Sequence, residues 1–129
     1  MNTMKAKILF VLSLLFGLGY INSGLNKIFN YMPVPPDLPE ELIKDSMALM
    51  EVSWLMPLVA AIEIIGGVLF IPARSRALGA IVILPITVGV LCVHSTVAPS
   101  GLPVALFIMA INIWVIIENR RRYLPMISK

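Results

Sequence analysis

The chain has 129 residues, of which 59% are hydrophobic and only 13% are charged, and its mean hydropathy is +0.94. Soluble domains typically contain about 25% charged residues, so this composition excludes an ordinary soluble domain and indicates an integral membrane protein. A formal net charge of +3, scattered along the chain, gives no reason to expect a nucleic-acid partner. The length allows a single transmembrane domain, which we expect to fill residues 1–129.

The chain has one cysteine, Cys92, and one histidine, His94. A single cysteine excludes both an intrachain disulfide and a C-x-x-C pair, and we expect Cys92 to be a small buried hydrophobic residue. The sequence has no H-x-x-x-H or E-x-x-H pair on a helix, so no metal or haem site is expected. Glycine-rich phosphate loops and nucleophile triads are also missing from the sequence.

The first apolar segment follows a short basic start and covers residues 8–29. It is long enough to cross a bilayer as a helix. A cleaved signal peptide is the weaker interpretation, because no small-x-small cleavage site follows cleanly. Two pairs of small residues spaced four apart predict close contact with another helix. These pairs are Ser13 with Gly17 and Gly19 with Ser23.

Residues 30–53 form the longest stretch outside the apolar segments, and the prolines in its first half exclude a regular helix there. A short helix is predicted to start at Asp37 or Pro39. Its first turn would hold Glu40 and Glu41, where carboxylates suit the helix dipole. We expect this helix to lie along the membrane surface or to re-enter the membrane.

The second apolar segment, residues 54–71, carries one carboxylate near its middle, Glu63. A charge at that depth costs about 2.5–3.5 kcal/mol on insertion scales, so it normally faces a protein interior or a wet cavity. Ala60, Gly66 and Gly67 lie three or four residues away, which puts small residues and the carboxylate on one helix face. We expect the two glycines to be packing residues, with Gly66 against the first helix.

Further spans are predicted at residues 77–97 and 102–117, followed by a basic tail at 118–129. With four spans, most lysine and arginine residues fall on one side of the membrane, which places both termini in the cytoplasm. Short connections then favour an up-down-up-down arrangement. The predicted fold is an all-α four-helix bundle that spans a cell membrane. We expect this membrane to be the inner membrane of a bacterium, with residues 30–53 outside the cytoplasm.

Polar groups within these spans lie in the outer half of the membrane or at its midplane. We expect an outward-opening pocket with Glu63 at its floor, Lys27 and Asn26 on one wall and His94 near its mouth. Each group also has a structural interpretation: a snorkelling lysine, interhelical asparagine hydrogen bonds, or a wet histidine. The candidate catalytic residues are Glu63 and His94, and the candidate ligand-binding residues are Asn22, Asn26, Lys27 and Asn112.

Several short stretches, in order along nearly the whole chain, resemble the DoxX family of small four-helix membrane proteins. They are Gly-Leu-Asn-Lys-Ile-Phe at 24–29, Glu-Ile-Ile-Gly-Gly-Val-Leu at 63–69, Pro85, and His94 before a short proline-glycine loop. By position, the residues that match the family pattern are Asn26, Lys27, Glu63, Gly66, Gly67 and His94.

The resemblance implies a function as well as a fold. The family takes its name from a membrane subunit of a thiosulfate–quinone oxidoreductase, so it implies an accessory subunit of a quinone-linked membrane system. Quinone is then the implied cofactor, other redox-complex subunits are the implied partners, and Glu63 with His94 would relay protons. Two alternatives stay open. The protein could be a binder, carrier or isomerase of a small lipophilic ligand over Glu63, or a structural or assembly factor; whether it is an enzyme is undecided.

Overall fold

Long apolar runs fold into helices, because a helix satisfies every backbone hydrogen bond within one segment. The computed structural model describes residues 3–127, and this part of the chain contains helices and no strands. The predicted all-helical class is confirmed. In chain order the elements are α1 (Thr3–Phe29), α2 (Glu40–Glu51), α3 (Leu55–Phe70), α4 (Arg76–Thr96), η1 (Pro99–Gly101), α5 (Leu102–Glu118), α6 (Arg120–Tyr123) and η2 (Leu124–Met126).

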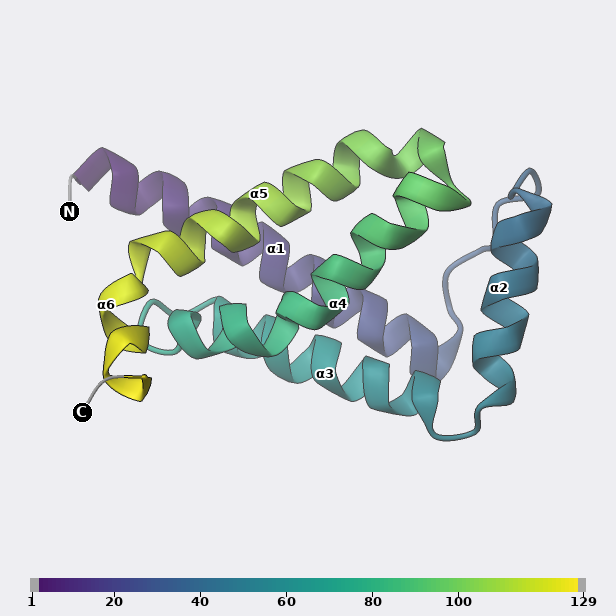
Figure 1. Ribbon diagram of the computed structural model, residues 1–129, viewed down its shortest axis with the longest axis horizontal. Coiled ribbons are helices and arrows are strands. Elements are labelled where there is room, and N and C mark those ends of the chain that lie inside the picture. The colour runs from purple at the N-terminus through teal and green to yellow at the C-terminus, as the bar shows by residue number, and fades with distance from the viewer. Residues whose placement is uncertain (1–2, 128–129) are drawn as a thin grey trace.

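The four longest helices lie along the long axis of the molecule, and each runs opposite to the one before it (Figure 1). The most extensive packing joins α1 to α3, then α3 to α4 and α4 to α5, whereas α1 and α5 contact each other little. Both ends of the chain lie at the same end of this assembly as the turn between α3 and α4 (Figure 1).

Three helical segments are long and apolar enough to cross a membrane: α1, α4 and the segment from Pro99 to Glu118. The helix α3 has 16 residues and qualifies only when it is joined to α2, from which it is bent by 98°. The described chain therefore has three candidate spans, or four if this bent pair is one span.

The predicted short helix in the loop is α2, which begins directly after Pro39 with Glu40 and Glu41 in its first turn. It buries none of its residues, and Met47, Leu49 and Met50 are exposed. In Figure 1 it stands across the long axis at the end of the molecule opposite the termini. Its position at the membrane surface stays a prediction.

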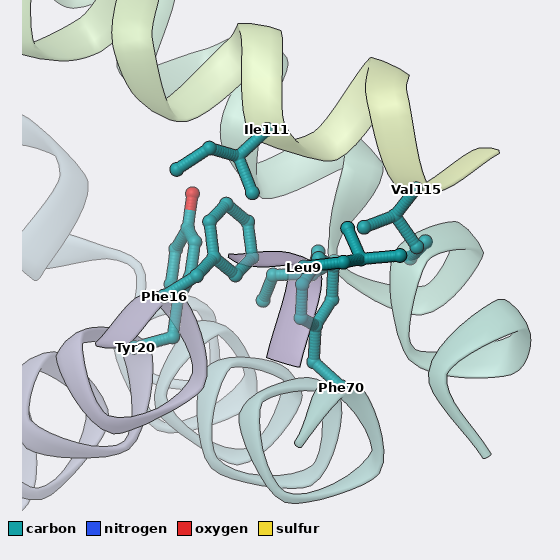
Figure 2. Packing of buried hydrophobic residues seen from close by; sticks show 8 residues of the cluster. Leu9, Phe16, Tyr20, Phe70, Ile111 and Val115 are labelled. Atoms are coloured by element: carbon teal, nitrogen blue, oxygen red, sulfur yellow. The ribbon is translucent and has the colours of Figure 1, made fainter. Parts of the chain in front are cut away.

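The core lies between α1, α3, α4 and α5, and Figure 2 shows its side chains from close by. Phe16 of α1 stacks on Phe70 of α3 with ring centroids 4.2 Å apart. The side chains of Leu9 and Val115 are almost completely buried beside them. This aromatic and aliphatic packing holds together the end of the bundle that contains the chain termini.

Glycines bring the backbones of α1 and α3 into contact. A Cβ added to Gly17 would lie 2.6 Å from the carbonyl oxygen of Gly67, and one on Gly24 would lie 2.7 Å from that of Ala60. Gly66 instead faces Ile83 of α4, so its predicted contact with the first helix is wrong. Adjacent helical residues point about 100° apart, which sends Gly66 and Gly67 to different neighbours.

Two further predictions about small residues are wrong. Gly19 has no heavy atom within 4 Å of an added Cβ, so it does not bring another helix close to α1. Cys92 is exposed on α4, not buried. Both residues lie on helix faces that the described chain leaves uncovered.

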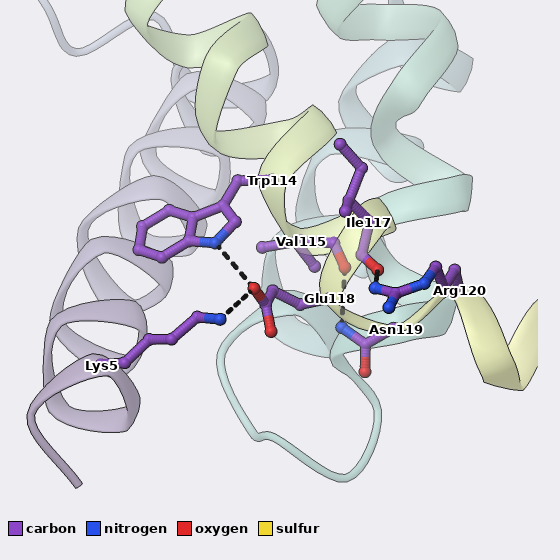
Figure 3. A network of polar contacts seen from close by, with 7 residues as sticks. All are labelled: Lys5, Trp114, Val115, Ile117, Glu118, Asn119 and Arg120. Carbon is purple, nitrogen blue, oxygen red and sulfur yellow. Dashed lines mark hydrogen bonds and ion pairs between the residues drawn. The ribbon is translucent and has the colours of Figure 1, made fainter. Parts of the chain in front are cut away.

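The ends of the helices near the termini are tied together by polar groups. Arg76 donates from Nε to the carbonyl oxygen of Phe70 at 3.0 Å and from Nη2 to that of Ile71 at 2.7 Å, so it caps the end of α3. Lys5 pairs with Glu118 at 2.6 Å, and Trp114 donates to the same carboxylate at 3.2 Å (Figure 3). This second set joins the start of α1 to the end of α5.

Candidate functional site

An ion pair between the partly buried Lys27 and the buried Glu63 connects α1 to α3. Lys27 Nζ lies 2.7 Å from Glu63 Oε1 and donates a second hydrogen bond to Ser23 Oγ at 2.9 Å. Ser23 and Lys27 are four residues apart and so lie on one face of α1. Glu63 is only 2% exposed, and its Oε2 atom has no hydrogen-bond partner among the described residues. The pair neutralises a carboxylate that would be expensive to leave alone in the bilayer.

A second polar array joins α1, α4 and α5 (Tyr20, Thr87 and Asn112). The hydroxyls of Tyr20 and Thr87 are 2.8 Å apart, and Thr87 donates to Asn112 Oδ1 at 2.8 Å. The amide nitrogen of Asn112 donates to the carbonyl oxygen of Ala80 at 3.1 Å. Thr87 and Asn112 are completely buried. This array is an interhelical hydrogen-bond network, as proposed in the structural interpretation of Asn112.

An apolar groove lies between α1, α4 and α5, on the side of α1 that faces away from α3. We call it the α1–α5 groove. Its volume is about 360 Å³, and most of its lining is aliphatic or aromatic, such as Leu15, Phe107 and Ile111. Gly19 lines it without a side chain, which leaves room between the two walls. The polar side chains in the lining are Tyr20 and Ser23. Tyr20 belongs to the network with Thr87 and Asn112, and Ser23 is bonded to Lys27 of the ion pair.

The structure brings some of the predicted site residues together and separates others. Lys27 and Glu63 form the ion pair, but neither lines the α1–α5 groove. His94 Nδ1 lies 2.9 Å from the carbonyl oxygen of Ala98, and its ring is in contact with Gly101, so it packs inside the turn between α4 and α5. No hydrogen bond or ion pair among the described residues joins His94 to Glu63.

The two asparagines near the end of α1 hold the loop that follows it. Asn26 Oδ1 accepts a hydrogen bond from the backbone nitrogen of Met32 at 2.9 Å. Tyr31 donates to the carbonyl oxygen of Asn22 at 3.0 Å and also contacts the Asn22 side chain. Neither asparagine lines the groove. Among the described residues, the side-chain hydrogen bonds of both asparagines are with this loop.

Two polar residues that line the groove were not predicted as site residues: Ser23, which was expected only to pack against another helix, and Tyr20. Tyr20 lies three residues before Ser23 and seven before Lys27, so helical spacing alone places all three on one face of α1. Its hydroxyl points toward α5 beside Ile111 (Figure 2). That spacing was the signal that could have identified it.

Comparison with known proteins decides the family. The DoxX family model matches residues 8–96, more than half of the chain. The chain belongs to the DoxX family. No match was found among curated proteins or solved structures. The segment matched to DoxX contains the Lys27–Glu63 pair, whereas the α5 wall of the groove lies beyond it.

Proposed function

We propose that this DoxX protein is an accessory subunit of a quinone-linked membrane oxidoreductase system and binds the quinone in the α1–α5 groove. One observation carries the proposal. The groove is apolar, yet both of its hydroxyls are held by hydrogen bonds: that of Tyr20 to the buried Thr87, and that of Ser23 to Lys27 of the ion pair. Small-molecule sites typically combine an apolar lining with a few placed polar groups in this way.

The size and position of the groove suit a quinone. At about 360 Å³ it falls in the range of small-molecule sites, large enough for a ring head and the first part of an apolar tail. The remainder of an isoprenoid tail would lie in the lipid, because α1 and α5 contact each other little along this side. The ligand would enter from the bilayer and not from water.

The distribution of basic residues supports an orientation with both termini in the cytoplasm. The basic residues Lys5, Lys7 and Arg74 lie in the termini or the α3–α4 turn, at one end of the molecule (Figure 1). The positive-inside rule places this end in the cytoplasm. We therefore propose one domain with four spans in a bacterial inner membrane, with α2 at the outer surface. Ser23 then lies in the outer half of the bilayer.

The proposed roles follow the contacts. Ser23 and Tyr20 face the ligand, and Glu63 acts on it through Lys27 and Ser23 without touching it. Asn112 has a structural role, because it holds Thr87 of α4 and does not line the groove. Neither His94 nor the asparagines at the end of α1 have a part in this arrangement, so a proton relay from Glu63 to His94 is not included.

Purified protein in lipid nanodiscs, titrated with decyl-para-benzoquinone, tests the proposal. A ligand at a hundred times its Kd stabilises the native state by about 2.7 kcal/mol, so a clear rise in Tm is expected. Deletion of the gene should lower quinone-linked activity in membranes, and the protein should co-migrate with other subunits on blue-native gels. No rise in Tm, together with unchanged activity in the deletion strain, would contradict the proposal.

A structural or assembly factor is the second candidate, because Lys27 and Glu63 join α1 to α3 by an ion pair of 2.7 Å. Exchanging them, as Lys27→Glu with Glu63→Lys, separates the two functions. An assembly factor should tolerate the exchange, since the ion pair is kept. Quinone binding should weaken about as much as in Ser23→Ala, because a carboxylate in place of Lys27 no longer donates to Ser23 and instead accepts the Ser23 proton.

A further inference from the structure

The two hydroxyls of the groove differ in where their protons go. Ala80 O can only accept, so the amide nitrogen of Asn112 faces it and Oδ1 faces Thr87. Thr87 has one proton, and both its other contacts, Asn112 Oδ1 and Ile83 O, are acceptors. Thr87 therefore receives its remaining hydrogen bond from Tyr20. The Tyr20 hydroxyl thus donates its proton to Thr87, and a bound ligand can only donate a hydrogen bond to the Tyr20 oxygen.

Ser23 is in the opposite situation. Its oxygen accepts a hydrogen bond from the Lys27 ammonium, which cannot accept one in return. The structure shows no hydrogen bond donated by the Ser23 hydroxyl among the described residues, although this side chain lines the groove. Its proton is thus available to a molecule bound there.

We infer that the Ser23 hydroxyl anchors the ligand by donating a hydrogen bond to a carbonyl oxygen of its head. This inference rests on the proposed quinone-binding function and specifies how the head is recognised. The ligand class is a lipophilic molecule with a carbonyl acceptor at its head. A pure hydrocarbon of the same shape would leave the Ser23 proton and the Tyr20 lone pair unpaired, which is costly in an apolar site.

Lys27 and Glu63 are positioning residues in this arrangement. The ammonium fixes the Ser23 oxygen from behind, and the carboxylate holds the ammonium in place at 2.7 Å. A hydroxyl that accepts a hydrogen bond from a cation is polarised and becomes a stronger donor. The ion pair would therefore act on the ligand through one serine, which explains how Glu63 can affect binding without lining the groove.

Binding of decyl-para-benzoquinone and of decylbenzene to the full chain in nanodiscs, measured by calorimetric titration, tests this inference. Ser23→Ala should weaken quinone binding about three- to tenfold, the value of one hydrogen bond, and leave decylbenzene binding unchanged. Ser23→Thr keeps the hydroxyl and should restore most of the affinity. Ser95→Ala is the matched control, because Ser95 is an exposed serine of α4 bonded to its own helix and does not line the groove.

Coupling to the ion pair supplies a readout that a purely structural role would not move. Glu63→Gln should weaken quinone binding when Ser23 is present and have little further effect in the Ser23→Ala background. If Ser23→Ala binds quinone as tightly as the wild type, the hydroxyl donates to its own helix and the inference is overturned, while the proposed function stands. If the wild-type chain binds no quinone, the proposed function and the inference both fail.

Discussion

The two sides of α1 show how one helix can make both a closed contact and an open one. Toward α3, Gly17 and Gly24 let the backbones touch, and a Cβ on Gly17 would lie 2.6 Å from a carbonyl oxygen. Toward α5, Gly19 meets nothing within 4 Å and lines a groove of about 360 Å³. A small residue in a membrane helix can therefore lie either at a close helix–helix contact or in the wall of a groove. Which of the two depends on what the neighbouring helix does.

The polar groups divide along the same line. The closed side contains the Lys27–Glu63 ion pair, and the open side contains the hydroxyls of Ser23 and Tyr20. Ser23 connects the two, since it accepts from Lys27 and lines the groove. A charge that could not be exposed to lipid is kept on the closed side, while its influence reaches the open side through a neutral hydroxyl.

Breaking the ion pair on the closed side should have the largest effect. Lys27→Met leaves the buried carboxylate of Glu63 without a partner, which should cost about 3 kcal/mol of unfolding free energy. Equilibrium unfolding in mixed micelles measures it. Adding Glu63→Gln should restore most of the stability, and a loss below about 1 kcal/mol for Lys27→Met alone would show that the pair contributes little.

Filling the closed interface should come next. Gly17→Leu places a side chain against the backbone of Gly67, and overpacking of this kind costs about 1–3 kcal/mol. The same unfolding experiment, together with the yield of folded protein, measures the loss. An unchanged stability would mean that α1 and α3 can move apart, and would contradict the close approach on which this comparison depends.

The ion pair and the helices could be predicted from the sequence, for a physical reason. Lys27 and Glu63 are isolated charges in apolar segments, and each needs an opposite charge more than it needs anything else. Helix positions follow from apolar length, and α2 follows from Pro39 with two acidic residues after it. In each case the constraint is local or involves a single obvious partner.

The groove could not be predicted, because it depends on how far α5 stands from α1. That distance is set by packing of whole helices and leaves no periodic mark in either one. His94 was misplaced for a related reason. Its depth in the membrane resembles that of Lys27, but the α4–α5 turn lies well apart from the end of α1 (Figure 1). Depth along a helix was available from the sequence, whereas the distance between the ends of two helices was not.

Removing the hydrogen-bond network on the open side should have a smaller effect. Asn112→Leu keeps the approximate volume and deletes the contacts with Thr87 and Ala80. Interhelical hydrogen bonds in membranes contribute about 0.6 kcal/mol each, so a loss of about 1 kcal/mol is expected in equilibrium unfolding. Thr87 can then donate to Ile83 O and still accept from Tyr20, so quinone affinity should change little. A loss above about 3 kcal/mol would show that this network, and not the glycine contact, holds the bundle together.

Filling the groove should have the smallest effect on stability and the clearest effect on binding. Gly19→Leu adds a side chain where no atom lies within 4 Å, and it replaces a poor helix former with a good one. Unfolding free energy should therefore stay the same or rise by a few tenths of a kcal/mol, in contrast to the same substitution at Gly17. Decyl-para-benzoquinone should no longer bind, because the leucine occupies the space of its ring. A destabilised Gly19→Leu protein would mean that α1 and α5 close on each other in the membrane. A stable variant that still binds quinone would place the ligand elsewhere.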